Sequence, residues 1–183
     1  GMVNAGLGYI YYNLGAPNAG AVKPLDSQEI FVTLGLNKLL SPTLTVYKEI
    51  DHYHQWYFLL GISHAFEFNK TVSLKLGASA SYLLSDYADA ARYNVQPSYG
   101  GYPKFNKNYQ ATNDKFKNFH DGVLTASLPI TLAKYVTVSP MVSYVFPLSS
   151  DAENEMKARG KKTDLGGNDS SHLFGGLTIT LSF

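Results

Sequence analysis

Large side chains recur at every second position in about eight stretches of the chain, whereas helical spacing is almost absent. A period of two places alternate side chains on opposite faces of a β-strand. The clearest stretch is 53–68, where large side chains occupy the even positions from Trp56 to Phe68. The pattern predicts an all-β chain. The predicted strands cover about 2–14, 27–37, 43–50, 53–68, 72–84, 120–132, 135–147 and 173–183.

The connections between these stretches alternate in length. Short connections are expected near 38–42, 69–71 and 133–135. Long ones cover about 15–26, 85–118 and 148–170, and a tight connection at Asp51 and His52 falls on the long-loop side. This asymmetry is typical of an antiparallel up-and-down transmembrane β-barrel. We expect one β-barrel domain over residues 1–183, with about eight strands and both termini at the short-turn end.

Face parity also predicts the register of two turns, because residues paired across a hairpin share a face. Phe68 should pair with Val72, and Leu132 with Val136. Glu67 should then lie opposite Ser73 and diagonal to Lys75, within reach of a charge pair.

The face opposite the large apolar side chains carries mostly Gly, Ser, Thr, Ala and Tyr. A strand facing water normally carries many charged residues, but charged residues make up only 16% of this chain, against about 25% in globular proteins. We therefore interpret this face as a crowded lumen. A soluble, lipocalin-like ligand-binding barrel with its apolar face inside is the alternative. The predicted lumen charges are Glu29, Glu49, Glu67, Lys75 and Asp121.

Aromatic residues concentrate where the predicted strands end, as in the two girdles of a membrane barrel. Lys48 interrupts the apolar face near its long-loop end, where its ammonium could reach lipid headgroups. The predicted girdle consists of Tyr9, Tyr11, Trp56, Tyr82, Tyr144 and Phe146 at the long-loop end and includes Phe183 at the other.

The last stretch, Leu173 to Phe183, alternates apolar residues and closes on a terminal Phe. It resembles the C-terminal strand by which the barrel-assembly machinery recognises Gram-negative outer-membrane proteins. The stretches 8–12, 40–44 and 60–64 are similar to an uncharacterised family of bacterial outer-membrane barrels. The resemblance implies a location in the outer membrane, periplasmic termini and further strands before the Tyr-rich one, so that this chain would form part of a larger barrel.

Charge and composition exclude several classes of function. The chain has 15 Lys and Arg against 14 Asp and Glu, so it lacks the positive field of a nucleic-acid binder. It has no Cys, which excludes disulfides and thiolate zinc sites. No apolar run reaches the roughly 18 residues of a membrane helix, and any export signal is expected to be removed or to lie outside this sequence. No phosphate-binding glycine loop is present, and no cofactor is expected.

Two groups of residues suggest chemistry. His52 and His54 lie two apart, next to Asp51, and are candidates for a metal site, or else for interfacial histidines of the aromatic belt. His120 with Asp121, and His172, lie where a membrane-embedded lipid-modifying hydrolase would place its site. Short polar residues at such a rim usually solvate loops, so we expect no catalytic residue.

The segment 85–118 is rich in aromatic residues among Asn, Lys and Gly. Such residues either stack on a ligand such as a sugar or pack the loop over the barrel mouth. The loop candidates for binding are Tyr93, Tyr99, Tyr102 and Tyr109. The charged stretch 151–162 is expected to be a solvated loop that contacts lipopolysaccharide through its cations.

Together these patterns predict a non-enzymatic outer-membrane β-barrel that acts as a narrow channel or as a structural or surface-binding protein. Its expected partners are outer-membrane lipid, lipopolysaccharide and the barrel-assembly machinery. An eight-stranded barrel is nearly filled by side chains, yet the predicted lumen is rich in small residues. Either the barrel holds a narrow cavity, or further strands join it from a longer chain or an oligomer.

Overall fold

The computed structural model describes residues 2–13, 26–51, 53–86, 102–163 and 169–182. Within them, nine strands form one antiparallel sheet, while two short strands and one helix lie outside it. The strands of the sheet are β1 (Val3–Tyr12), β2 (Ser27–Leu36), β3 (Thr43–Glu49), β4 (Gln55–Glu67), β5 (Ser73–Ser85), β8 (Lys117–Ser127), β9 (Ile130–Ala133), β10 (Val136–Pro147) and β11 (His172–Leu181).

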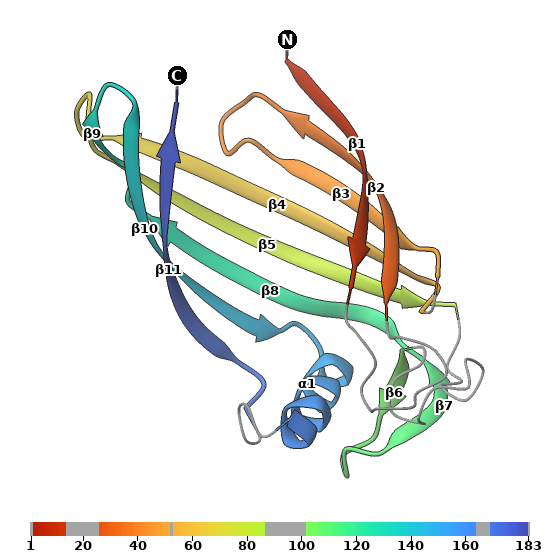
Figure 1. Cartoon of the computed structure of the whole chain (residues 1–183). Helices are drawn as coiled ribbons and strands as arrows, with labels where there is room; N and C mark the ends of the chain where they lie inside the picture. Colours follow the sequence, from red (N-terminus) through yellow and green to blue (C-terminus); the bar gives the residue numbers. More distant parts are fainter. Residues whose placement is uncertain (1, 14–25, 52, 87–101, 164–168, 183) are drawn as a thin grey trace.

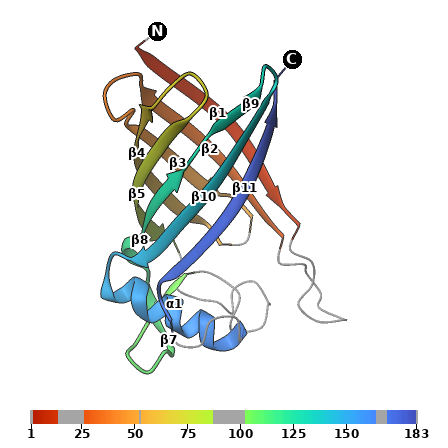
Figure 2. The ribbon, with the colours of Figure 1, turned by 90° about the vertical axis from the view of Figure 1, so that its left-hand side faces the viewer.

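The sheet curls into a half-barrel (Figure 1, Figure 2). Its strands follow the order β1-β2-β3-β4-β5-β8-β10-β11, and β9 pairs with β10. β1 and β11 form the two edges, and they do not pair with each other in the described part of the chain. The predicted antiparallel β architecture is confirmed, whereas these nine strands do not close into a barrel.

The two ends of the half-barrel differ. Both termini lie at the end that carries the short turns after β2, β4 and β9, which we call the turn end (Figure 1). The helix α1 (Ser150–Thr163) and the hairpin of β6 (Pro103–Phe105) and β7 (Ala111–Lys115) lie at the opposite, loop end. The helix of the described chain lacks the length and apolar character that crossing a membrane requires.

Large apolar side chains share one exposed face of the sheet, which we call the outer face. The outer face is continuous across neighbouring strands because their apolar residues pair with each other: Leu34 pairs with Leu44, and Leu44 pairs with Leu60. Leu60 is 54% exposed and Leu177, on β11, is 64% exposed. Burying apolar area is worth about 25 cal/mol per Å², yet every strand of the sheet leaves at least one large apolar side chain exposed on this face. The apolar residues therefore do not form the interior.

The other face, which we call the inner face, lies inside the curl and carries small and polar side chains. Thr45, Ser81 and Ser143 are nearly completely buried on it. Gly8 is required there, because a Cβ atom at this position would overlap the ring of Phe31 on β2. A cavity of about 280 Å³ is lined by the small residues Thr43, Gly61, Ser63, Gly77, Ser79 and Thr125, among others.

The register predicted for the turn between β4 and β5 is confirmed. Phe68 donates its backbone N–H to the carbonyl of Val72 at 3.0 Å, and Glu67 pairs with Ser73. Glu67 and Lys75 are both exposed at the turn end and form no ion pair within the described residues. Diagonal neighbours in a sheet are about 7–8 Å apart, so water screens these two charges.

The register predicted for the turn before β10 is wrong. Ala133, and not Leu132, pairs with Val136, and a bulge follows before Thr131 pairs with Thr137. The predicted strand 120–132 is also divided into β8 and β9. Pro129 lies at the break, where its missing N–H prevents a continuous ladder.

Two predicted loops contain regular structure. Segment 85–118 includes the β6–β7 hairpin, and segment 148–170 includes α1, which the period-two analysis did not predict. Ser149 caps α1, because its hydroxyl accepts the N–H of Ala152 at 3.2 Å. Lys157 and Glu153 add an ion pair one turn apart along the helix.

A small apolar core lies at the loop end. Phe116 is completely buried and packs with Leu83 of the inner face and Ala152 of α1. Tyr57 and Tyr102 pack against this core. Residues far apart in the sequence therefore hold α1 and the hairpin on the sheet.

We expect Phe116→Ala to lower the free energy of unfolding by about 3–5 kcal/mol, because it removes a fully buried ring from this core. Chemical denaturation of the refolded protein measures the effect. Leu39→Ala serves as the control, since Leu39 is 77% exposed in the short turn after β2 and exposed substitutions usually change stability by about 0.5 kcal/mol or less. Similar losses in both variants would contradict the proposed core.

Candidate functional site

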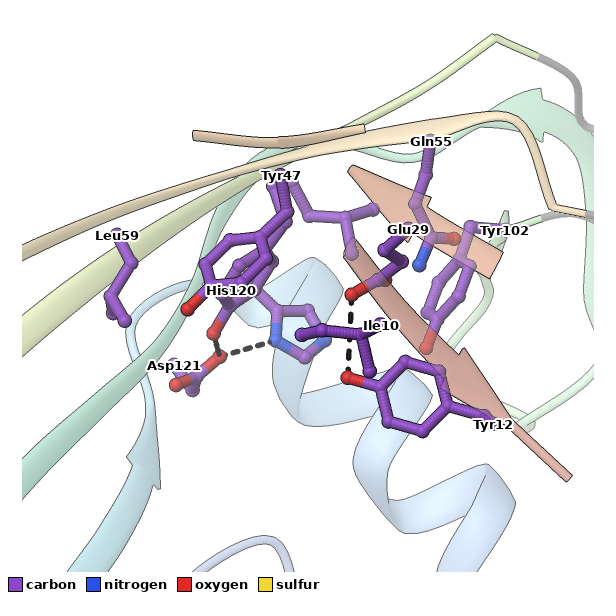
Figure 3. Close-up of a pocket in the computed structure, with 11 residues that line it drawn as sticks. Ile10, Tyr12, Glu29, Tyr47, Gln55, Leu59, Tyr102, His120 and Asp121 are labelled. Atoms are coloured by element: carbon purple, nitrogen blue, oxygen red, sulfur yellow. Dashed lines mark hydrogen bonds and ion pairs between the residues drawn. The ribbon is translucent and has the colours of Figure 1, made fainter. Parts of the chain in front are cut away.

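A cavity of about 330 Å³ opens on the inner face at the loop end (Figure 3). We call it the rim cavity. It combines aromatic rings, two carboxylates and an imidazole, all within reach of one small molecule. Its lining residues are Ile10, Tyr12, Glu29, Tyr47, Gln55, Tyr57, Leu59, Leu83, Tyr102, His120 and Asp121.

Strand pairing explains why most of these side chains meet. Phe31 pairs with Tyr47 and Tyr47 with Tyr57, so their rings form a row across β2, β3 and β4. The Phe31 and Tyr47 ring centroids are 5.4 Å apart, and those of Tyr47 and Tyr57 are 6.1 Å apart. Such aromatic pairs across strands stabilise a sheet.

A β-bulge brings His120 and Asp121 into the cavity together. Ala80 pairs with Gly122 and Tyr82 with Phe119, so two residues of β8 lie opposite the single residue Ser81. Strict alternation would send neighbouring side chains to opposite faces. The extra residue breaks this alternation, and both side chains line the rim cavity.

His120 lies between two carboxylates. Its Nδ1 is 2.8 Å from Asp121 Oδ1, and its Nε2 is 3.3 Å from Glu155 Oε2 on α1. A neutral imidazole donates from one nitrogen only, whereas the cationic ring donates from both. The two acceptors therefore favour the cationic ring, which joins α1 to the sheet.

Asp121 accepts hydrogen bonds from three side chains through one oxygen. The Tyr57 hydroxyl donates to Oδ1 at 2.6 Å and the Ser81 hydroxyl donates at 2.7 Å, in addition to His120. Ser81 also accepts the backbone N–H of Asp121 at 2.9 Å. The carboxylate thus fixes the bulge and orients the neighbouring ring.

His120 does not face a serine hydroxyl in the described structure. A nucleophilic hydroxyl must lie within hydrogen-bond reach of its base, but Ser81 bonds to Asp121, and both nitrogens of His120 face carboxylates. His172, the other histidine considered for such a site, is exposed at the start of β11. The geometry is suited to holding a group in place.

Glu49 has a structural role in the connection between β3 and β4. It is fully buried and accepts the backbone N–H groups of Asp51, Tyr53 and His54 at 3.1, 2.7 and 2.6 Å. The Ser27 hydroxyl donates a further bond at 3.2 Å. His54 itself has a positive φ of 48°, so the carboxylate holds a tight, strained turn.

The metal site considered at His52 and His54 finds no support among the described residues. His52 lies outside them, and no group of three potential ligands occurs within them.

Glu29 faces the rim cavity from β2 and is half-buried. Its carboxylate accepts one long hydrogen bond, from the Tyr12 hydroxyl at 3.3 Å (Figure 3). Gln55 also lines the cavity, and its buried Oε1 has no hydrogen-bond partner in the described structure.

The structure distributes the other predicted site residues over both faces and both ends. Glu67 and Lys75 lie far from the rim cavity, near the turn end. Tyr102 lines the cavity, whereas Tyr109 lies in the β6–β7 turn with a positive φ of 61°. The predictions for Tyr93, Tyr99, His52 and Phe183 concern residues outside the described ones.

Most of the predicted girdle lies on the outer face at the loop end. Trp56 stacks beside Phe58 at 6.4 Å, and Tyr144 stacks beside Phe146 at 5.6 Å. Tyr9 and Tyr11 are about half exposed, at 56% and 51%. Lys48 lies over the Trp56 ring and pairs with Asp86 at 2.5 Å, so its ammonium has a protein partner.

Comparison with protein-family models, with curated proteins and with solved structures gave no match to this chain.

Sequence reasoning missed Tyr57, Ser81 and Glu155 as parts of the site. Parity places Tyr57 and Ser81 on the inner face, but their contact with Asp121 depends on the pairing of β5 with β8 and on the bulge. Glu155 could be placed only by recognising α1, for which the N-cap residue Ser149 and the acidic first-turn residues Asp151 and Glu153 are the available signal.

The docking of α1 should weaken in acid because of Asp151. Partial burial disfavours its ionised form, but hydrogen bonds from Asn118 and Lys104 outweigh this effect and hold the pKa of Asp151 below its ordinary value. A lowered pKa adds stability above the ordinary carboxyl value of about 3.9, and this stability is lost as the pH falls through the lowered pKa. We expect Asp151→Asn to destabilise α1 at neutral pH and to have no effect in strong acid.

Amide hydrogen exchange of α1 between neutral pH and strong acid measures this effect. Lys104→Met should reproduce the loss at neutral pH, and the double variant should add little to either single change, because the two residues form one pair. Additive effects would show that the pair does not act as proposed.

Proposed function

We propose that this protein is a non-enzymatic β-barrel protein of the bacterial outer membrane, with a structural or small-molecule-binding role. The observation that carries the proposal is the continuous exposed apolar face of the sheet. Exposed apolar patches on soluble proteins rarely exceed a few hundred Å². A face that extends over all nine strands is suited to contact with lipid.

The placement of charge and of aromatic rings supports this role. The charged residues on the outer face of the described strands, Lys48 and Lys117, lie at the loop end. Trp56, Phe58 and Tyr82 form a ring cluster at the same level. Aromatic and cationic residues concentrate at membrane interfaces in this way.

The lengths of the strands other than β3, with 7 residues, and β9, with 4, agree with a bilayer. A transmembrane β-strand needs about 9–11 tilted residues. β1, β2 and β11 have 10 residues each, and β4 and β5 have 13. The longer strands therefore extend beyond the lipid at one end.

The proposed orientation follows from the two ends of the half-barrel. Short turns and termini face the periplasm in such barrels, which would place α1 and the β6–β7 hairpin outside the cell. There they would meet lipopolysaccharide. The C-terminal strand β11 is the element that the barrel-assembly machinery would recognise.

We also propose that further strands close the sheet, from a longer chain or from a second copy. Every residue of β11 is exposed, on both faces, and β1 is paired on one side only within the described residues. In lipid, unpaired backbone groups cost several kcal/mol each. A barrel that includes more strands would satisfy these edges.

α1 and the Phe116 core lie over the loop end of the inner face. An open channel needs a continuous water-filled lumen. The covered mouth favours a structural or binding role over that of an open pore.

The protein folded in detergent should migrate differently on a gel before and after boiling, while a sample kept without detergent should show no such shift. The physical reason is that a sheet closed into a barrel, here by the further strands or the second copy proposed above, resists unfolding until it is heated. Circular dichroism verifies the β-structure of the folded sample. A stable fold without detergent, with the apolar face buried, would overturn the proposal and favour a soluble barrel.

A charge on the outer face should be costly in lipid. Leu60→Arg, in the middle of β4, should destabilise the protein folded in vesicles by about 2–4 kcal/mol. Ser63→Arg is the matched control, because Ser63 lies on the same strand and lines the inner cavity of about 280 Å³. Equal costs for both variants in chemical unfolding would contradict the assignment of the faces.

A further inference from the structure

We propose that the rim cavity binds a small organic cation through an ammonium group, with Glu29 as its charge partner and the surrounding tyrosines as its walls. This inference goes beyond the membrane role. It depends only on the geometry of the rim cavity.

The described residues provide no cation for the carboxylate of Glu29. No Lys or Arg lines the rim cavity, and Glu29 accepts only the long bond from Tyr12. Its direct partner across the β2–β3 ladder is another carboxylate, Glu49. Like charges directly opposite each other destabilise a sheet, so a cation bound at Glu29 would relieve this repulsion.

His120 does not supply the missing charge. Its ring lies between Asp121 and Glu155, and one positive charge is shared by two carboxylates there. The inner surface at the loop end therefore retains an excess of acidic groups around Glu29.

The walls of the cavity favour an organic cation. Tyr12, Tyr47 and Tyr102 surround the space beside Glu29 (Figure 3), and Tyr57 continues the row from Tyr47. Aromatic faces attract ammonium groups, by about 0.5–2 kcal/mol for each good contact. The unpartnered Oε1 of Gln55 adds an acceptor that a nearby N–H donor could satisfy after a small rotation of the amide.

Two other ligand classes fit less well. A metal ion prefers several carboxylate or imidazole ligands, and no group of three such residues occurs in the described structure. A neutral sugar would use the rings but would leave the charge of Glu29 uncompensated. The volume of about 330 Å³ suits a molecule with few heavy atoms.

Binding of choline to the folded protein tests the inference, with its neutral isostere 3,3-dimethylbutan-1-ol as the matched probe. Equilibrium dialysis should show saturable binding of choline and binding of the alcohol that is weaker by about tenfold or more. Glu29→Gln should weaken choline binding to a similar degree. Glu67→Gln should not change choline binding, because Glu67 lies at the turn end of β4, whereas the rim cavity lies at the loop end of that strand.

A second pair of variants keeps the test decisive if Glu29→Gln does not fold, as judged by circular dichroism. Tyr47→Phe keeps the ring and should retain binding, whereas Tyr47→Leu removes it and should lose binding. Equal binding of the two probes would overturn the inference, as would undiminished binding by a folded Glu29→Gln variant. A folded protein that binds no choline would overturn it too, while leaving the proposed membrane role intact.

Discussion

The two faces of this protein depend on the register of its backbone hydrogen bonds. Within a strand every second residue shares a face, and each strand pairs with its neighbour in the sheet so that apolar residues lie opposite apolar residues, from Val3 opposite Leu36 to Val136 opposite Leu181. A slip of one residue in any ladder would move a whole set of apolar side chains to the inner face. The two register shifts in the sheet lie at Ala80/Tyr82, in the loop-end half of the β5–β8 ladder, and at Val136/Thr137, at the start of β10.

The bulge opposite Ser81 has a local consequence for chemistry. It breaks the alternation of β8 at His120 and Asp121, and it thereby places two ionisable groups side by side in one cavity. Asp121 stabilises this irregular backbone through Ser81, and His120 extends the network to Glu155 on α1. The same feature therefore shapes the rim cavity and attaches the helix that covers it.

Strand positions and parity could be predicted from the sequence, because they reflect a local period of two. Glu29 and Glu49 lie opposite each other on one face, in agreement with the alternation, and the turn at Phe68 and Val72 follows from the same rule. The bulge, the break at Pro129 and the helix α1 could not be derived from that period. They depend on single residues and on contacts distant in sequence, such as that of Phe116 with Ala152. For the same reason, the closure of the sheet could not be decided from local pattern.

Glu29 and Glu49 show how two equal residues on neighbouring strands acquire different roles. Glu49 is fully buried, and its two oxygens accept backbone N–H groups of the β3–β4 connection together with the Ser27 hydroxyl. These bonds occupy the acceptor sites of the Glu49 carboxylate. Glu29 lies directly opposite Glu49 across the ladder but accepts a single long bond, from Tyr12. The turn thus fixes one carboxylate as structure and leaves the other to define the electrostatic character of the cavity.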